Sequence, residues 1–148
     1  MVSSTMSTET LRILLIDDSE TEVIGLKRAF DLLGIDGTIL TAGTGEVGIE
    51  ILKRMAVEQS EIRPPIVLLD INLPGADGLE TLEIIRATPL IKDVRVFVWS
   101  GMGGQQERDA ANKLDIEGFL LKTSADVTYA KAAAMLNDYW KSDRPRSW

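Results

Sequence analysis

The sequence predicts an α/β fold built on a parallel sheet, and three observations support this prediction. Short apolar runs alternate with amphipathic, helix-like segments from Leu11 to Lys141. Four of the apolar runs end on a polar residue that could do chemistry. The chain has 148 residues, of which 45% are hydrophobic and 26% charged, a size and composition that suit one domain with a sizeable core.

The strands are identified by short apolar runs, and the helices by apolar residues that recur every three or four positions. The predicted strands cover residues 13–16, 38–42, 66–69, 94–99 and 119–121. The predicted helices cover residues 20–33, 46–55, 79–87, 105–114 and 125–141. Turn-forming residues, such as Pro64-Pro65 and Thr88-Pro89, separate these elements. We therefore expect one domain over residues 11–142, with a disordered N-terminal tail at 1–10 and a C-terminal tail at 143–148.

The first helix has clear signals at both of its ends. Ser19 is a favourable N-cap residue, and Glu22 stands three positions later, in the spacing of a capping box. Gly34 follows the last apolar residue and predicts the end of the helix. Ser124 is expected to cap the last helix in the same way as Ser19 caps the first.

The composition excludes several classes of function. A net charge of −7 argues against a nucleic-acid-binding face, because such a face neutralises phosphates with Lys and Arg. The absence of His removes the commonest general base and any Ser-His-Asp triad, and the chain cannot carry a phosphohistidine. The absence of Cys agrees with a cytoplasmic location. The chain also has no apolar stretch of the roughly 18 residues that span a bilayer, and residues 1–10 contain no apolar segment typical of a secretory signal.

Polar side chains follow four of the predicted strands. They are Asp17-Asp18 after the first strand, Asp70 after the third, Ser100 after the fourth and Lys122 after the fifth. The carboxyl ends of parallel strands lie at one edge of the sheet, where α/β folds bind their ligands. Three carboxylates packed together repel one another unless a cation compensates them. Mg²⁺, which prefers oxygen ligands, and the Lys122 ammonium would supply that charge. The pattern therefore describes a divalent-cation site beside an aspartate that can be phosphorylated.

With these residues in place, the chain resembles a bacterial response-regulator receiver domain. The resemblance covers about residues 11–141 and includes the signature positions in their usual order: Asp17-Asp18, Asp70, the loop at 73–78, Ser100, Phe119 and Lys122. It implies a flavodoxin-like, doubly wound sheet of five parallel strands in the order 2-1-3-4-5, with five helices.

The resemblance also implies a role for each acidic residue. Asp70 would accept a phosphoryl group from a histidine kinase and form an acyl phosphate. Asp18 and Asp70 would bind Mg²⁺ directly, Asp17 would act largely through water, and the backbone carbonyl of Asn72 would add a ligand.

The remaining signature residues would convert phosphorylation into a change of shape. Ser100 would donate a hydrogen bond to the phosphoryl group, Lys122 would stabilise its charge, and Phe119 would fill the space that Ser100 vacates. The switching surface would then comprise the fourth helix, the fifth strand and the fifth helix, which could also form a homodimer.

The implied partners are a sensor histidine kinase and a downstream protein or phosphotransfer protein. The short chain and the Tyr139-Trp140 ending of the last helix resemble single-domain regulators that pair with bacterial phytochromes.

One departure from the family pattern keeps other functions open. Thr123 stands where a proline with a cis peptide bond usually follows the signature lysine, and a cis bond before a non-proline residue costs about 2.5–4 kcal/mol. A non-phosphorylated pseudo-receiver scaffold is therefore one alternative.

Two further alternatives share parts of this pattern. A Mg²⁺-dependent aspartyl-phosphate phosphohydrolase would need a second acid at the position of Asn72, which cannot transfer protons. A flavodoxin-type FMN binder would place a phosphate beside Asp17, Asp18 and Glu20, which would repel it.

Overall fold

The computed structural model describes residues 10–71, 78–100, 105–121, 125–142 and 148. The strands are β1 (Leu11–Ile16), β2 (Gly37–Ala42), β3 (Ile66–Asp70), β4 (Val96–Ser100) and β5 (Gly118–Leu121). The helices are α2 (Glu20–Leu33), α3 (Gly45–Glu58), α4 (Gly78–Ala87), α5 (Gln105–Asn112) and α6 (Ala125–Ser142). No helix in these described ranges is both long enough and apolar enough to cross a membrane.

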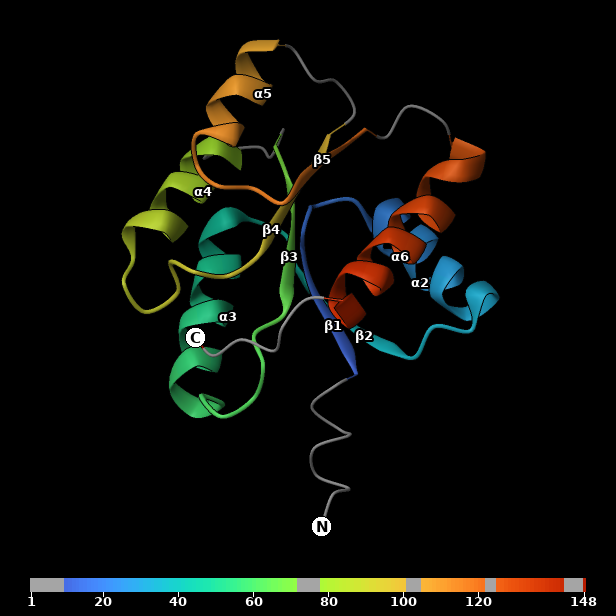
Figure 1. The fold of residues 1–148 in the computed structure, drawn as a ribbon, viewed down its shortest axis with the longest axis horizontal. Coiled ribbons are helices and arrows are strands. Elements are labelled where there is room, and N and C mark those ends of the chain that lie inside the picture. The colour runs from blue at the N-terminus through green and yellow to red at the C-terminus, as the bar shows by residue number, and fades with distance from the viewer. Residues whose placement is uncertain (1–9, 72–77, 101–104, 122–124, 143–147) are drawn as a thin grey trace.

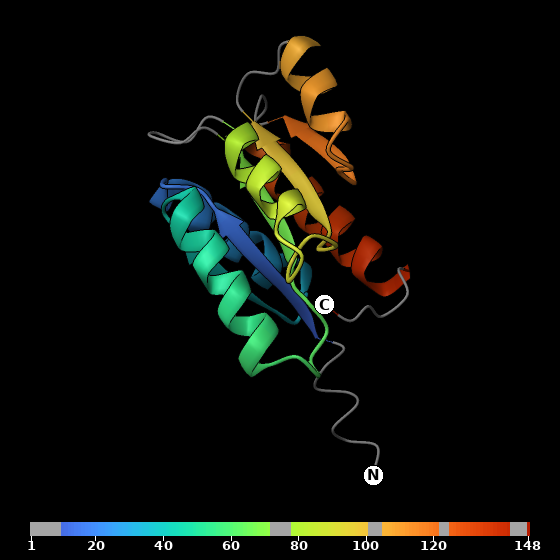
Figure 2. The ribbon, with the colours of Figure 1, turned by 90° about the vertical axis from the view of Figure 1, so that its left-hand side faces the viewer.

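The five strands form one parallel sheet in the order β2-β1-β3-β4-β5. Helices α2 and α6 lie together on one side of this sheet, and α3, α4 and α5 lie on the other (Figure 1). Figure 2, turned by a right angle, shows α3 and α4 in front of the sheet. This is the flavodoxin-like, doubly wound architecture, so the predicted fold class and strand order are confirmed.

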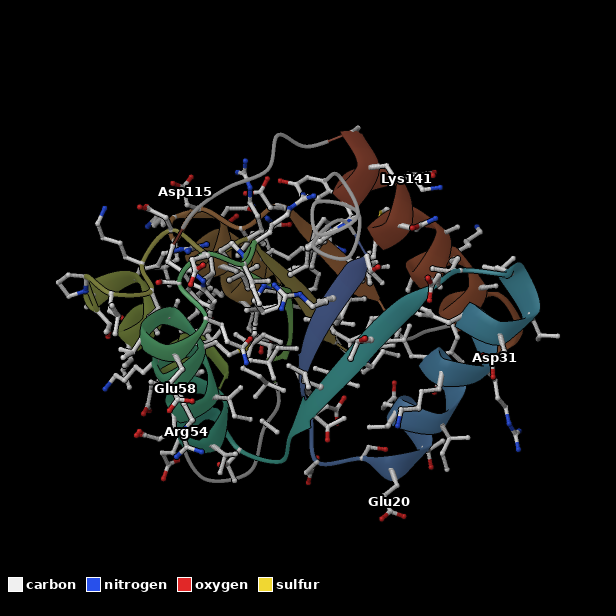
Figure 3. All side chains as sticks on the ribbon, turned by 90° about the horizontal axis from the view of Figure 1, so that it is seen from below. Glu20, Asp31, Arg54, Glu58, Asp115 and Lys141 are labelled. Carbon is white, nitrogen blue, oxygen red and sulfur yellow. The ribbon has the colours of Figure 1, made fainter. Side chains whose placement is uncertain are left out.

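The sheet separates two apolar clusters, because successive side chains of a strand point to opposite faces. On β1, Leu11, Ile13 and Leu15 pack towards α2 and α6, whereas Leu14 and Ile16 pack towards α3 and α4. All of these side chains are buried, as expected for strands that are covered on both faces. Charged side chains such as Asp31, Arg54 and Lys141 point outward instead (Figure 3). The burial of both faces fixes the register of the central strands and the positions of their carboxyl ends.

The beginning of α2 differs in one respect from the predicted capping box. Ser19 is the N-cap, and its Oγ accepts a hydrogen bond from the Glu22 backbone N–H at 3.4 Å. The Glu22 carboxylate, however, accepts a hydrogen bond from Trp99 Nε1 at 2.9 Å. The Ser19 backbone N–H, which a capping box would pair with the Glu22 carboxylate, donates to Asp17 Oδ1 at 2.9 Å. The reciprocal half of the capping box was therefore a wrong prediction, whereas the predicted helix end is confirmed, because Gly34 adopts a left-handed conformation with φ 66°.

Several element boundaries differ from the prediction by one to three residues; for example, β1 begins at Leu11 and α3 ends at Glu58. Two of these differences, in β4 and α5, have a visible structural context. Strand β4 begins at Val96, two residues later than predicted, because the Val94 carbonyl accepts a hydrogen bond from Arg86 Nη1 at 2.8 Å. Helix α5 ends at Asn112, two residues earlier than predicted, and Asp115 soon afterwards has a positive φ of 62°. A positive φ at a non-glycine residue is incompatible with a continuing helix.

The predicted tails lie almost wholly outside the described residues, which begin at residue 10 and omit 143–147. Trp148 is described: its Nε1 donates a hydrogen bond to the Ile62 carbonyl at 3.1 Å, and its ring packs against the apolar cluster on the α3 side of the sheet.

Candidate functional site

Three carboxylates meet at the carboxyl edge of the sheet. Asp17 and Asp18 follow β1, and Asp70 is the last residue of β3, the neighbour of β1. One oxygen from each carboxylate lies within 4.8 Å of the others. Asp17 and Asp70 are only 4% and 6% exposed, whereas Asp18 is exposed. The cluster is therefore buried at its base and open to solvent on the Asp18 side.

Backbone hydrogen bonds hold the two buried acids in place. The Asp17 N–H donates to the Ala42 carbonyl of β2 at 2.9 Å, which extends the β1–β2 pairing by one residue. On the other side, the Ile71 N–H donates to the Trp99 carbonyl of β4 at 3.2 Å, and the Gly78 N–H donates to the Ile71 carbonyl at 3.1 Å. The main chain on both sides of the cluster is thus fixed before any ligand binds.

The donor set of this cluster fits a divalent cation. Carboxylates as close as these repel one another, and a bound cation relieves that repulsion. Oxygen ligands of this kind are the ones that Mg²⁺ and Mn²⁺ take. The acids predicted from the sequence therefore come together in a group that could bind a metal ion.

Ser100 and Phe119 occupy different parts of the neighbouring strands. Ser100 is fully buried at the end of β4, one residue beyond Trp99, which is the β4 partner of Asp70. Phe119 of β5 pairs with Val98 of β4 and is partly buried. The Arg108 guanidinium lies over its ring, 4.9 Å from the ring centroid. Ser100 is therefore at the edge that carries Asp70, and Phe119 lies deeper along β5.

Two of the predicted site residues, Asn72 and Lys122, lie outside the described residues. The same holds for most of the loop at 73–78 and for the Lys122-Thr123 peptide bond.

A group beside the acids was missed in the sequence. Trp99 Nε1 donates to Glu22, and burial together with the charges of Glu22 and Asp17 raises the pKa of the Tyr129 hydroxyl. These residues come from β4, α2 and α6, so no local pattern connects them. The one available sign was Gly25 inside a helix, because a glycine there often permits close packing.

Comparison with known proteins decides the family. The model of the response regulator receiver domain matches residues 13–134 of the chain. The chain belongs to this receiver family. It is accordingly a receiver-domain response regulator of two-component systems.

Two relatives show how far the sequence similarity extends. This receiver is 33% identical over 124 residues to the nitrate/nitrite response regulator NarL of Escherichia coli K12, an alignment that covers 84% of this chain and 53% of NarL. The chain thus spans about half the length of NarL. It is 25% identical over 128 residues to the response regulator Rcp1 of Synechocystis, an alignment that covers 86% of this chain and 87% of Rcp1.

Two solved structures share the fold of this receiver. The phosphorylated cyanobacterial phytochrome response regulator RcpA has a TM-score of 0.75 and 22% identity, and covers 89% of this chain and 94% of its own. The Mn²⁺-bound form of Rcp1 has a TM-score of 0.75 and 21% identity, and covers 93% of this chain and 99% of its own.

Proposed function

We propose that Asp70 is the phosphoacceptor of this receiver. In this proposal the receiver occupies residues 11–142 and acts in the cytoplasm. It is a phosphoacceptor switch and not an enzyme with a separate substrate. The supporting observation is the position of Asp70, a buried carboxylate at the end of a central strand and inside a group of three acids. An Asp70 oxygen attacks phosphorus while the bond from phosphorus to the donor breaks, and the donor leaves with the electron pair. The donor is the phosphohistidine of a sensor histidine kinase.

Mg²⁺ is the proposed cation of the acid cluster. Asp18 and Asp70 would hold it directly, Asp17 through water, and the Asn72 carbonyl would complete the protein ligands. The bound ion, with Lys122, would stabilise the negative charge that develops on the transferred phosphoryl oxygens. The mutual proximity of the three carboxylates supports this assignment.

The proposed switch uses Ser100 and Phe119. The buried Ser100 hydroxyl would donate to a phosphoryl oxygen, and Phe119 would then move into the space that Ser100 leaves. The surface that changes would be α5-β5-α6, and a homodimer through this surface is part of the proposal. The position of Ser100 one residue beyond the β-sheet partner of Asp70 supports its role.

The proposed kinase is a phytochrome, and the output is a downstream protein or a phosphotransfer protein. The likeness in fold to RcpA, a cyanobacterial phytochrome response regulator, supports this choice. The response regulator RPA3017 in red light signaling of R. palustris also shares the fold, with a TM-score of 0.79.

The phosphoacceptor assignment is tested by intact-mass measurement after incubation with acetyl phosphate and Mg²⁺. We expect the wild type to gain one phosphoryl group, and Asp70→Asn or chelation of the cation to abolish the gain. Asp31→Asn, which removes an exposed carboxylate from α2, is the matched control and should be phosphorylated normally. No gain in the wild type would favour the pseudo-receiver scaffold, and fast turnover of phosphate esters would favour the phosphohydrolase.

The metal assignment is tested by replacing Asp18 with asparagine. Without a cation, the free energy of unfolding of Asp18→Asn should equal that of the wild type or be higher by up to about 1 kcal/mol, because one of three mutually repelling charges is removed. Mg²⁺ at about 100-fold above its dissociation constant should raise the free energy of unfolding of the wild type by about 2.7 kcal/mol. Asp18→Asn should show only a small part of this increase.

Urea unfolding with Mg²⁺ and with EDTA measures both effects. Glu20→Gln, which neutralises an exposed acid outside the three-carboxylate cluster, should keep the full response to Mg²⁺. An equal gain in Asp18→Asn and the wild type would contradict the assignment.

A further inference from the structure

The Glu22 carboxylate is shared by two aromatic side chains from different elements. Trp99 Nε1 of β4 donates to Glu22 Oε2 at 2.9 Å. Burial, the charge of Glu22 and a side-chain interaction with Glu22 raise the pKa of Tyr129 on α6, so Tyr129 faces the same carboxylate. The two rings lie next to each other, with their centroids 6.1 Å apart. One acidic side chain of α2 therefore joins β4 to α6. We refer to Glu22, Trp99 and Tyr129 as the aromatic–acid triad.

Trp99 is attached to the acid site through its main chain. It is the β4 partner of Asp70, and its carbonyl accepts the hydrogen bond from the Ile71 N–H. Ser100 is the next residue, so a movement of Ser100 towards a group on Asp70 also displaces the end of β4 that carries Trp99. The indole is 2% exposed and packed within the core on the α2/α6 side, which leaves it little room to adjust independently.

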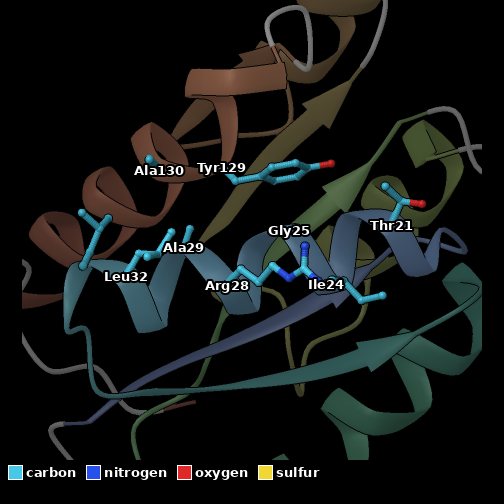
Figure 4. Close-up of a pocket in the computed structure, with 9 residues that line it drawn as sticks. Thr21, Ile24, Gly25, Arg28, Ala29, Leu32, Tyr129 and Ala130 are labelled. Atoms are coloured by element: carbon cyan, nitrogen blue, oxygen red, sulfur yellow. The ribbon is translucent and has the colours of Figure 1, made fainter.

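Tyr129 is held closely against α2. A Cβ placed at Gly25 would lie 2.5 Å from Tyr129 Cε2, so the ring occupies the place of a side chain at Gly25. Figure 4 shows the ring lying across α2, with its hydroxyl directed towards the end that carries Thr21. Tyr129 also forms part of the wall of a groove of about 680 Å³ between α2 and α6, together with Ile24, Arg28 and Leu32.

Charge connects the aromatic–acid triad to the acid cluster independently of packing. Burial is the largest cause of the raised pKa of Tyr129, and the negative charges of Glu22 and Asp17 raise it further, so the hydroxyl lies within the electrostatic field of the cluster. A cation bound by the acids, or a phosphoryl group on one of them, changes this field.

We propose that Glu22 is a positioning residue that couples occupancy of the acid site to helix α6, through its hydrogen bond to Trp99 and its interaction with Tyr129, whose ring lies next to that of Trp99 and against α2. The proposal rests on the proposed function, because it requires a cation and a phosphoryl group at the site. Displacement of β4 alters the Trp99–Glu22 bond, and the shared carboxylate passes the change to Tyr129. Occupancy of the acid site thereby changes the position of Tyr129, which lines the groove between α2 and α6.

The test uses the full chain labelled with 3-fluorotyrosine and observed by fluorine NMR. The chain contains two tyrosines, so Tyr129 and Tyr139 give two signals. Tyr139, also on α6, gives a second signal for comparison, since its hydroxyl donates to Glu117 Oε1 at 2.6 Å, outside the aromatic–acid triad. Mg²⁺ and then beryllofluoride, a phosphoryl mimic, are added to the wild type, Glu22→Gln, Glu22→Ala and the matched control Glu117→Gln.

We expect both additions to shift the Tyr129 signal of the wild type. Glu22→Ala, which removes the shared acceptor, should reduce this response to less than half. Glu22→Gln keeps an acceptor without its charge, so it should fold normally and give an intermediate response. Glu117→Gln should change the resting Tyr139 signal and leave the Tyr129 response at its wild-type size.

Backbone amide signals of Asp70 and Ser100 separate the two possible failures. If they do not respond to Mg²⁺ or beryllofluoride in the wild type, the proposed function is wrong and the coupling is wrong with it. If they respond, and Tyr129 shifts equally in the wild type and in both Glu22 variants, the coupling alone is overturned.

Discussion

Replacing Gly78 with alanine is expected to destabilise this receiver by about 3 kcal/mol and to weaken its binding of Mg²⁺, because overpacking against rigid neighbours forces the backbone apart. A Cβ at Gly78 would lie 2.5 Å from the Asp70 carbonyl oxygen and would also clash with the Ile71 Cα. Both are backbone atoms at the end of β3, so no side-chain rotation can relieve the contact. Helix α4 would have to move away from the strand that carries Asp70.

Urea unfolding and Mg²⁺ titration measure the two consequences of this change. Gly43→Ala is the matched control, because a Cβ there has no atom within 4 Å. This control should stay within about 0.5 kcal/mol of the wild type and bind Mg²⁺ normally. A Gly78→Ala protein as stable as Gly43→Ala would show that α4 does not need its close approach to β3.

Replacing Arg86 with alanine is expected to cost about 3 kcal/mol, because hydrogen bonds from a charged donor are each worth about 1.5–3 kcal/mol and these bonds share one partly exposed group. The Arg86 guanidinium donates to four backbone carbonyls. They belong to Leu114 at 2.7 Å, Lys92 at 2.7 Å, Val94 at 2.8 Å and Asp115 at 2.9 Å. One side chain of α4 thus holds the turn before β4 and the turn after α5.

Arg86→Lys should recover less than half of the lost stability, because an ammonium cannot reproduce the planar fork of donors. Arg54→Ala, at an exposed position on α3, is the control and should change the free energy of unfolding by no more than about 0.5 kcal/mol. Hydrogen exchange adds a local measurement: amides of α5 should lose protection in Arg86→Ala. Unchanged protection there, with unchanged stability, would contradict the role of Arg86.

The sheet and the three acids could be predicted from the sequence because each depends on a short local pattern. The apolar runs that precede Asp17 and Asp70 have the length and composition typical of strands buried on both faces, and parallel pairing brings their ends together. The strand order came from the family resemblance, and the structure confirms it.

Other features could not be predicted because they depend on contacts between distant segments. The sequence placed Val94 in a strand, but its carbonyl is taken by Arg86 of another element. Glu22 has the spacing of a capping box, yet its carboxylate binds Trp99, which is 77 positions away. The local capping rule offers the Glu22 carboxylate one hydrogen-bond donor, the Ser19 N–H, but a tertiary contact supplies Trp99 Nε1 instead.

Among the residues that the structure describes, the two apolar clusters on opposite sides of the sheet have no buried residue in common. Substitutions that reshape the α2/α6 side can therefore accumulate without repacking the α3/α4/α5 side. Evolution, or a protein engineer, could alter the packing on one side of the sheet while conserving the packing on the other.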